Sequence, residues 1–159
     1  MAYTIEQYDK WKTRILKYVL YKKRTEHEIR QKFEIEKRKN NSDLSQEMME
    51  DIIQELKENG YISDLDYIDR SVKEFMSLKN MSVKEILYKL YSKGVSKNVM
   101  EEYVQEHIDE LEDFEIKSAE RIALKKASTC ERDDIYQYMF RKGYKSENIL
   151  KALDKLENI

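Results

Sequence analysis

The stretch "EILYKLYSKGVSKNVM", from Glu85 to Met100, decides the fold, because the chain repeats its pattern further on. From Asp134 to Leu150 the sequence reads "DIYQYMFRKGYKSENIL". Both stretches have an isoleucine, an apolar residue four positions later, an aromatic residue, Lys-Gly, and then Asn with two apolar residues. Recurrence at a period of roughly 20–50 residues is typical of arrays in which each unit is one supersecondary structure. The pattern therefore predicts an internal repeat.

The composition favours helices as the material of that repeat. Charged residues make up 39% of the chain, yet the formal net charge is only −2, which is typical of many solvated helix faces. There is no proline, and the three glycines, Gly60, Gly94 and Gly143, are expected to mark helix ends. No segment alternates polar and apolar residues over a useful length, so we expect no strands.

Apolar residues at spacings of three and four predict nine helices in three groups of three. Capping signals begin the second, fourth and fifth helices, at Thr25 with Glu28, Ser63 with Asp66, and Ser82 with Glu85. The predicted caps of the sixth and ninth helices are Ser96 and Ser146, and the seventh helix is expected to begin at about Phe114. In the third group, Glu131 occupies the position at which the other groups have a capping Ser or Thr.

The predicted fold class is all-α, with three tandem three-helix repeats of helix-turn-helix type that form an elongated, curved array. The expected boundaries are residues 1–62, 63–112 and 113–159, within one continuous repeat domain. One such unit buries little apolar surface alone, so neighbouring repeats are expected to stack.

Charge follows the predicted repeat, because the first and second helices of each group are mostly basic and the third helices of the first two groups are acidic. Stacking would align the basic helices into a stripe that suits an acidic polymer or an acidic protein groove. The alternative is that the charges pair neighbouring repeats, at about 0–1 kcal/mol for each surface pair. The predicted contact residues are Lys10, Arg14, Lys17, Arg30, Arg70, Lys73, Lys89, Lys93, Arg121, Lys125, Arg141 and Lys142. Lys89 with Lys93, and Arg121 with Lys125, are expected to share a helix face at i, i+4.

Catalytic and metal chemistry find little support in the sequence. Cys130 is the only cysteine, and His27 and His107 are the only histidines, so no zinc-ligand spacing occurs. There is no Gly-rich phosphate loop and no recognisable nucleophile arrangement. We expect no enzyme activity, no metal and no cofactor. The N-terminal residues do not resemble a signal peptide, and no apolar run is long enough to cross a membrane, which favours a cytoplasmic protein.

The aromatic residues raise base stacking as an alternative to core packing. Most of the tyrosines that fall on apolar stripes are expected to pack in the core, with the hydroxyl at its edge. Tyr91 and Phe140 occupy the same repeat position, which predicts a shared packing role between second and third helices. The stripe tyrosines are Tyr8, Tyr18, Tyr103 and Tyr138.

The segment "NGYISDLDYIDRSVKEF", from Asn59 to Phe75, resembles the hallmark segment of RecX proteins, which are regulators of the RecA recombinase. The stretch that begins at Ser82 looks like the second-repeat signature of that family. The stretches "YVLYKKRTEHEIRQKF" and "RIALKKASTCERDDIYQYMFRKGYKSENILKAL" resemble its first and third repeats, so the resemblance covers nearly the whole chain. The positions that match the family motif are Gly60, Tyr61, Asp64, Tyr67, Gly94 and Gly143.

This resemblance implies a crescent of three repeats that binds in the helical groove of the RecA–DNA filament and spans neighbouring protomers. It implies inhibition of RecA ATP hydrolysis, strand exchange and coprotease activity, within recombination, DNA repair and the SOS response. It also implies a monomeric, non-enzymatic protein that touches DNA, if at all, through the filament. Two other classes stay open: a sequence-independent nucleic-acid-binding helical module, and a generic helical scaffold.

Overall fold

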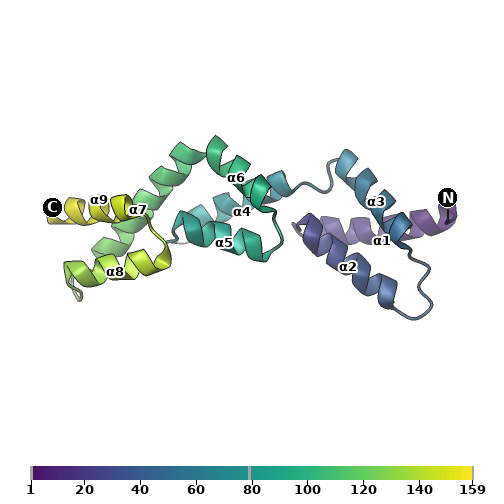
Figure 1. Ribbon diagram of the computed structural model, residues 1–159, viewed down its shortest axis with the longest axis horizontal. Coiled ribbons are helices and arrows are strands. Elements are labelled where there is room, and N and C mark those ends of the chain that lie inside the picture. Colours follow the sequence, from purple (N-terminus) through teal and green to yellow (C-terminus); the bar gives the residue numbers. More distant parts are fainter. Residues whose placement is uncertain (1, 79, 159) are drawn as a thin grey trace. The chain divides into compact units, whose positions relative to one another are not determined.

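The computed structural model describes residues 2–78 and 80–158, and within these residues the chain is all-helical, with no strand. The helices appear in Figure 1 as a purple-to-yellow succession. Their bounds are α1 (Ile5–Tyr21), α2 (Glu26–Arg38), α3 (Gln46–Glu58), α4 (Asp64–Leu78), α5 (Val83–Ser92), α6 (Lys97–Glu106), α7 (Ile108–Lys126), α8 (Arg132–Lys142) and α9 (Ser146–Glu157). The predicted all-α class and the predicted number of helices are confirmed for this part of the chain.

The chain forms two compact units. The first contains Met1–Tyr67 together with Lys93–Val95, and the second contains Ile68–Ser92 together with Ser96–Ile159. This division cuts α4 near its start and does not coincide with the three predicted repeat boundaries.

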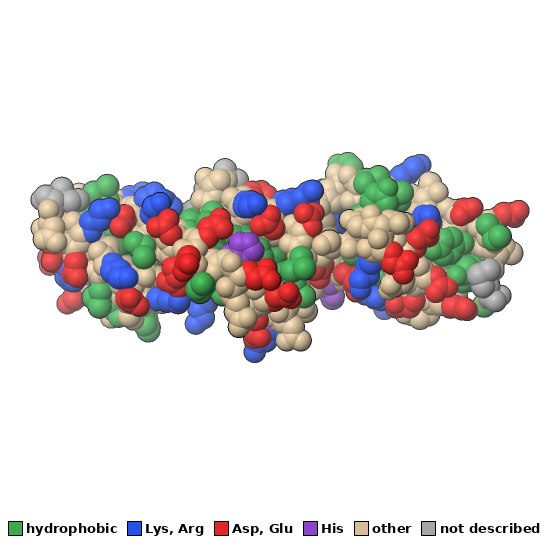
Figure 2. Space-filling view, turned by 90° about the horizontal axis from the view of Figure 1, so that it is seen from above, with side chains coloured by type: hydrophobic (Ala, Val, Ile, Leu, Met, Phe, Trp, Pro, Cys, Tyr) green, Lys and Arg blue, Asp and Glu red, His purple; other side chains and the backbone are tan. Residues whose placement is uncertain are grey.

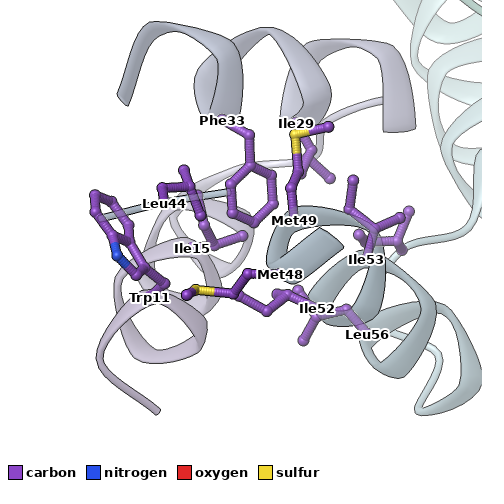
Figure 3. Close-up of a cluster of buried hydrophobic side chains, with 11 residues drawn as sticks. Trp11, Ile15, Ile29, Phe33, Leu44, Met48, Met49, Ile52, Ile53 and Leu56 are labelled. Atoms are coloured by element: carbon purple, nitrogen blue, oxygen red, sulfur yellow. The ribbon is translucent and has the colours of Figure 1, made fainter. Parts of the chain in front are cut away.

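The first unit packs α1, α2 and α3 around one apolar cluster, shown as sticks in Figure 3. Phe33 and Ile29 of α2 point from one side toward Met48 and Ile52 of α3, and Ile15 of α1 lies between them. These side chains recur every three or four residues on their helices, so each helix buries one continuous stripe. All five are essentially inaccessible to solvent.

The second unit has a comparable cluster where α7, α8 and α9 meet, at the end of the chain that Figure 1 draws from green to yellow. Ile122 and Ala119 of α7 pack against Ile135 and Met139 of α8 and against Ile149 of α9. Small residues on α7 let α9 lie close along it. Ser118 of α7 also shares a hydrogen bond of 2.6 Å with the buried Tyr144 hydroxyl.

The predicted N-caps are mostly confirmed. Thr25 accepts a hydrogen bond from the Glu28 amide, and the Glu28 carboxylate accepts one from the Thr25 amide, so both halves of the capping box are present. Ser82 and Glu85 make the same reciprocal pair at 3.0 Å each way. Each pair satisfies amides that have no partner within the helix.

Two boundary predictions are wrong. The seventh helix begins at Ile108 rather than near Phe114, because only His107, with φ −120° and ψ 23°, interrupts the helix between α6 and α7. The chain turns sharply at this point (Figure 1). Asp109 and Glu110 then occupy the first turn of α7, where carboxylates stabilise the positive helix end. Ser146 is not a cap, since Lys145 precedes α9 and no side chain caps it.

Three aromatic predictions are also wrong. Tyr138 is 40% exposed, whereas Tyr103 is buried as expected. Tyr91 and Phe140 are 64% and 55% exposed, so they do not pack between second and third helices. All three are exposed at the margin of the apolar stripes of their helices. Their spacing places these residues at the edge of an apolar stripe. Spacing alone does not distinguish residues at the edge of a stripe from residues at its centre, so it could not predict their exposure.

The same pair of hydrogen bonds ties helices together at two places. In the first unit the Thr25 hydroxyl donates to the Lys93 carbonyl at 2.6 Å, and the Glu26 amide donates to the Asp64 carboxylate at 2.9 Å. Thr25 is fully buried. Its side-chain oxygen accepts a hydrogen bond as the cap of α2, and the same hydroxyl donates one to the carbonyl of the Lys-Gly turn.

In the second unit the Ser82 hydroxyl donates to the Lys142 carbonyl at 2.7 Å, and the Val83 amide donates to the Glu115 carboxylate at 2.9 Å. Ser82 and Glu115 are as buried as Thr25. The repeated "Lys-Gly" therefore has a structural cause: the start of one basic helix docks on the turn that ends another. The turn must offer a carbonyl and must lack a side chain at the contact.

Candidate partner-binding surface

The predicted contact residues lie on six helices and one turn, and most of their side chains reach solvent. The exposed residues without an ion pair to a described residue are the most available for a partner. They are Arg14 and Lys17 on α1, Lys89 on α5, Lys93 in the turn after α5, Arg121 and Lys125 on α7, and Arg141 on α8. Arg70 is exposed on α4.

Four other predicted contact residues are engaged by carboxylates within their own unit. Lys10 lies 3.1 Å from Asp43, and Lys73 lies 2.9 Å from Asp69, one helical turn away. The Asp69 carboxylate raises the pKa of the Lys73 ammonium by hydrogen bonding. These surface pairs contribute at most about 1 kcal/mol each, so a strongly acidic partner could replace them.

Arg30 and Lys142 are the other two engaged cations. Arg30 forms a two-pronged contact with Glu50 of α3 and a further bond with Glu26, and the Glu50 hydrogen bond raises its pKa. Lys142 is half-buried and lies 3.4 Å from Glu85. The Lys142 contact joins the second and third predicted repeats, as the alternative interpretation expects, whereas the Arg30 contacts lie within the first predicted repeat.

The expected helical pairs differ in outcome. Arg121 and Lys125 both lie within α7 and are exposed, so they share a helix face as predicted. The prediction for Lys89 and Lys93 is wrong, because α5 ends at Ser92 and Lys93 lies in the following turn. That turn is set by Gly94, whose φ of +91° is incompatible with continued helix.

The motif residues that carry the family resemblance lie mostly in turns and at helix ends. Gly60 has φ +79° after α3, and the next amide, that of Tyr61, donates to the Leu56 carbonyl at 2.8 Å. Tyr61 itself is exposed, and Tyr67 is half-buried on α4. Gly143 caps α8 in the left-handed conformation.

Asp64 joins two helices, since it starts α4 and its carboxylate accepts the Glu26 amide of α2. Burial raises the pKa of this carboxyl above its ordinary value, and the nearby Glu26 charge adds to the effect. The sequence could not reveal this contact, because the two residues lie far apart in the chain.

Each pair of basic helices also carries a lysine over an aromatic ring. These contacts join the first and second helices of each predicted repeat. In the first two repeats the lysine is on the second helix and the ring on the first, whereas in the third repeat the lysine is on the first helix and the ring on the second. Such contacts contribute about 0.5–1 kcal/mol at exposed sites. The pairs, by distance from Nζ to ring centroid, are Lys32 over Tyr18 at 5.5 Å, Lys89 over Phe75 at 5.7 Å, and Lys126 over Tyr138 at 4.0 Å.

Charges of both signs are intermixed on the face that Figure 2 shows, with Lys and Arg side chains beside Asp and Glu within each unit. Within each unit, the Lys and Arg side chains on that face are thus interspersed with carboxylates. Across residues 2–78 and 80–158, no group of three or more His, Cys, Asp and Glu side chains is placed to hold a metal ion. Among these residues no helix is both long and apolar enough to cross a membrane.

Comparison with known proteins agrees with the fold and the motif. A regulatory protein RecX from Finegoldia magna is 33% identical over 91 residues, which is 57% of this chain and 42% of that protein. One from Lactococcus lactis subsp. cremoris is 28% identical over 96% of this chain and 57% of its own length. The chain thus spans about half the length of these curated relatives. No protein-family model matches it.

A solved structure shares the fold over nearly the whole chain. The crystal structure of RecX from Lactobacillus salivarius superposes with a TM-score of 0.77, at 21% identity, and the match covers 98% of this chain and 100% of that one. The chain is an all-helical protein, as the sequence predicted. Its helix order, its Lys-Gly turns and its exposed cations are the features that define this class. The chain is similar in sequence to curated RecX proteins over 96% of its length and shares the fold of a solved RecX structure. The resemblance drawn from its motifs is thereby confirmed.

Proposed function

We propose that this chain is a non-enzymatic regulator that binds the RecA–DNA filament and inhibits RecA. Similarity to curated proteins named regulatory protein RecX carries the proposal, and the motif resemblance supplies RecA as the partner. The chain acts as a monomer in the cytoplasm, and the three predicted repeats act together as one docking element.

The exposed cations of the first and second helices of each predicted repeat are the proposed contacts. Arg14, Lys89 and Arg141 stand on three such helices, and none is held by a carboxylate of a described residue. A partner that pairs with them therefore displaces water and salt rather than an internal ion pair. Contacts on successive protomers would add through effective concentration, which makes several weak contacts sufficient.

Inhibition requires that the chain prefer one filament geometry over another. A ligand shifts a conformational equilibrium only by its differential affinity for the two states. If the bound geometry cannot hydrolyse ATP, filling the groove lowers turnover without any chemistry on the part of this chain. No cofactor is required for such a mechanism.

The direct test is RecA ATPase activity on single-stranded DNA while this protein is titrated in. The proposal expects a progressive loss of ATP turnover that saturates when the filament is covered. Unchanged turnover at concentrations far above that of RecA would reject it. The rival function, a nucleic-acid-binding module that acts by removing DNA, predicts that excess single-stranded DNA restores turnover fully.

A further inference from the structure

Two cavities lie at corresponding places in the first and third predicted repeats. One, of about 340 Å³, lies between α1 and α2 and is lined by the buried Ile15. The other, of about 370 Å³, lies between α7 and α8 and is lined by the buried Ile122. Ile15 and Ile122 occupy matching positions of their repeats, as do Ile29 and Ile135 on the second helices. The first cavity belongs to the first unit and the second cavity to the second unit.

The cavity between α7 and α8 has an excess of positive charge. Lys125, Lys126 and Lys142 line it, and Lys142 lies 3.4 Å from Glu85, whereas the other two form no ion pair with a described residue. The C-terminal ends of α7 and α8 each contribute about −0.5 of a charge. The three ammonium groups carry three positive charges, and the carboxylate and the two helix ends together carry about two negative charges. The cavity therefore has an excess of about one positive charge. Asn80 and Thr129 add neutral polar groups to the wall.

The cavity between α1 and α2 repeats this charge pattern with different residues. Arg14, Lys17 and Lys32 line it with one carboxylate, that of Glu36. Glu36 accepts hydrogen bonds from Lys32 and from Lys39, each at 3.1 Å, so its charge is already matched. Arg14 and Lys17 form no ion pair with a described residue.

An aromatic ring lies beside the cations of each cavity, but only Tyr138 is exposed, because Trp11 is buried and its indole nitrogen donates to Asp43. Trp11 lies 4.9 Å from the Arg14 guanidinium carbon, and Tyr138 lies 4.0 Å from the Lys126 ammonium. Sites for single-stranded nucleic acid combine cations for the backbone with aromatic rings for the bases or sugars. An acidic peptide would need the cations alone.

We propose that each cavity binds one phosphodiester group of a single-stranded nucleic acid, and that Tyr138 lies against the adjoining sugar or base at the cavity between α7 and α8. A phosphodiester carries a single negative charge, which matches the excess in the cavity between α7 and α8. This binding goes beyond the proposed filament docking, since it requires no RecA. It gives Arg14, Lys17, Lys125 and Lys142 a second role in strand binding, besides the docking proposed above, whereas Lys89 and Arg141 serve the protein partner alone.

The test is fluorescence anisotropy of a labelled oligothymidylate of about 20 nucleotides, titrated with this protein alone at about 50 and 200 mM salt. The variants are Lys125→Gln with Lys126→Gln, and Arg14→Gln with Lys17→Gln. Each phosphate contact contributes about 0.7 to the slope of log affinity against log salt. We expect each double variant to weaken binding roughly fivefold and to lower the slope by about 0.7.

The matched control is Lys97→Gln with Lys151→Gln, two exposed lysines on α6 and α9 that line neither cavity. It removes the same charge and is expected to change affinity less than about twofold. A second variant, Lys125→Arg with Lys126→Arg, keeps the charge and should keep the binding. Equal loss in the control, absence of binding by the unaltered protein, or equal competition by polyglutamate would each overturn the proposal. RecA is absent, so failure here leaves the ATPase test undecided.

Discussion

At the scale of single residues, the glycines of the chain are required for two different reasons. Gly60 has φ +79°, but a Cβ there would meet no atom within 4 Å. Gly94 has φ +91°, and a Cβ there would lie 2.3 Å from the His27 Cβ. The sequence predicted both as helix ends, which their left-handed conformation explains. It could not reveal the close approach of His27, because that contact joins distant parts of the chain.

Gly60→Ala and Gly94→Ala should therefore differ in cost. The left-handed conformation alone should lower the free energy of unfolding by about 1–2 kcal/mol in Gly60→Ala. Gly94→Ala should lose roughly 1–3 kcal/mol more, because α2 must move away from the turn. Urea unfolding followed by circular dichroism measures both. Equal losses in the two variants would show that the contact with His27 is unimportant.

Asp64 should make stability depend on pH in a particular direction. Its pKa is raised by burial, so the folded state holds its proton more tightly than the unfolded state does. Its contribution is therefore fully present at low pH and is lost as pH rises through the raised folded value. Asp64→Asn keeps an oxygen to accept the Glu26 amide and removes the buried charge.

We expect Asp64→Asn to match the unaltered protein near pH 3 and to be more stable at pH 7, with the difference growing above the ordinary carboxyl pKa of about 4. Thermal unfolding across this pH range gives the measurement. A variant that is less stable at pH 7 than at pH 3, relative to the unaltered protein, would contradict this assignment. Asp133→Asn, which removes an exposed carboxylate in the first turn of α8, is a suitable comparison.

At the scale of helices, the sequence predicted most beginnings and endings because caps are local. Thr25, Ser82 and Ser96 act as expected, since each side chain accepts an amide three residues on. Sequence could not show that the first two hydroxyls also donate to Lys-Gly carbonyls. Nor could it place the break at His107, because residues 101–115 have no Gly or Pro and favour helix throughout.

Removing a hydroxyl with two roles should cost more than removing one with a single role. Ser82→Ala loses the cap of α5 and leaves the Lys142 carbonyl without its donor, at about 2–3 kcal/mol in the free energy of unfolding. Ser96→Ala loses only the exposed cap of α6, at about 1 kcal/mol. Chemical denaturation of both variants tests this difference. If Ser96→Ala proves the costlier change, the bond to Lys142 contributes little.

At the scale of the whole molecule, the repeat pattern predicted the fold class, and the solved RecX structure agrees with it over 98% of the chain. Fold class was predictable because helix periodicity and capping are written in neighbouring residues. The binding surface was less predictable, since Lys10 and Arg30 look the same in sequence as Arg14 or Lys89. Only the structure shows which cations are held by carboxylates from elsewhere in the fold. The three-repeat boundaries and the docking residues stay predictions.

The central claim is that exposed cations of the first and second helices of each predicted repeat dock this chain on RecA. Its most direct test compares Lys89→Glu with Arg141→Glu against Lys97→Glu with Lys151→Glu, which makes the same charge change on α6 and α9. Inhibition of RecA ATPase on single-stranded DNA is measured for both. We predict that the first pair raises the half-inhibitory concentration at least tenfold, about 1.4 kcal/mol, while the second stays within about threefold. Equal inhibition by both pairs would contradict the claim.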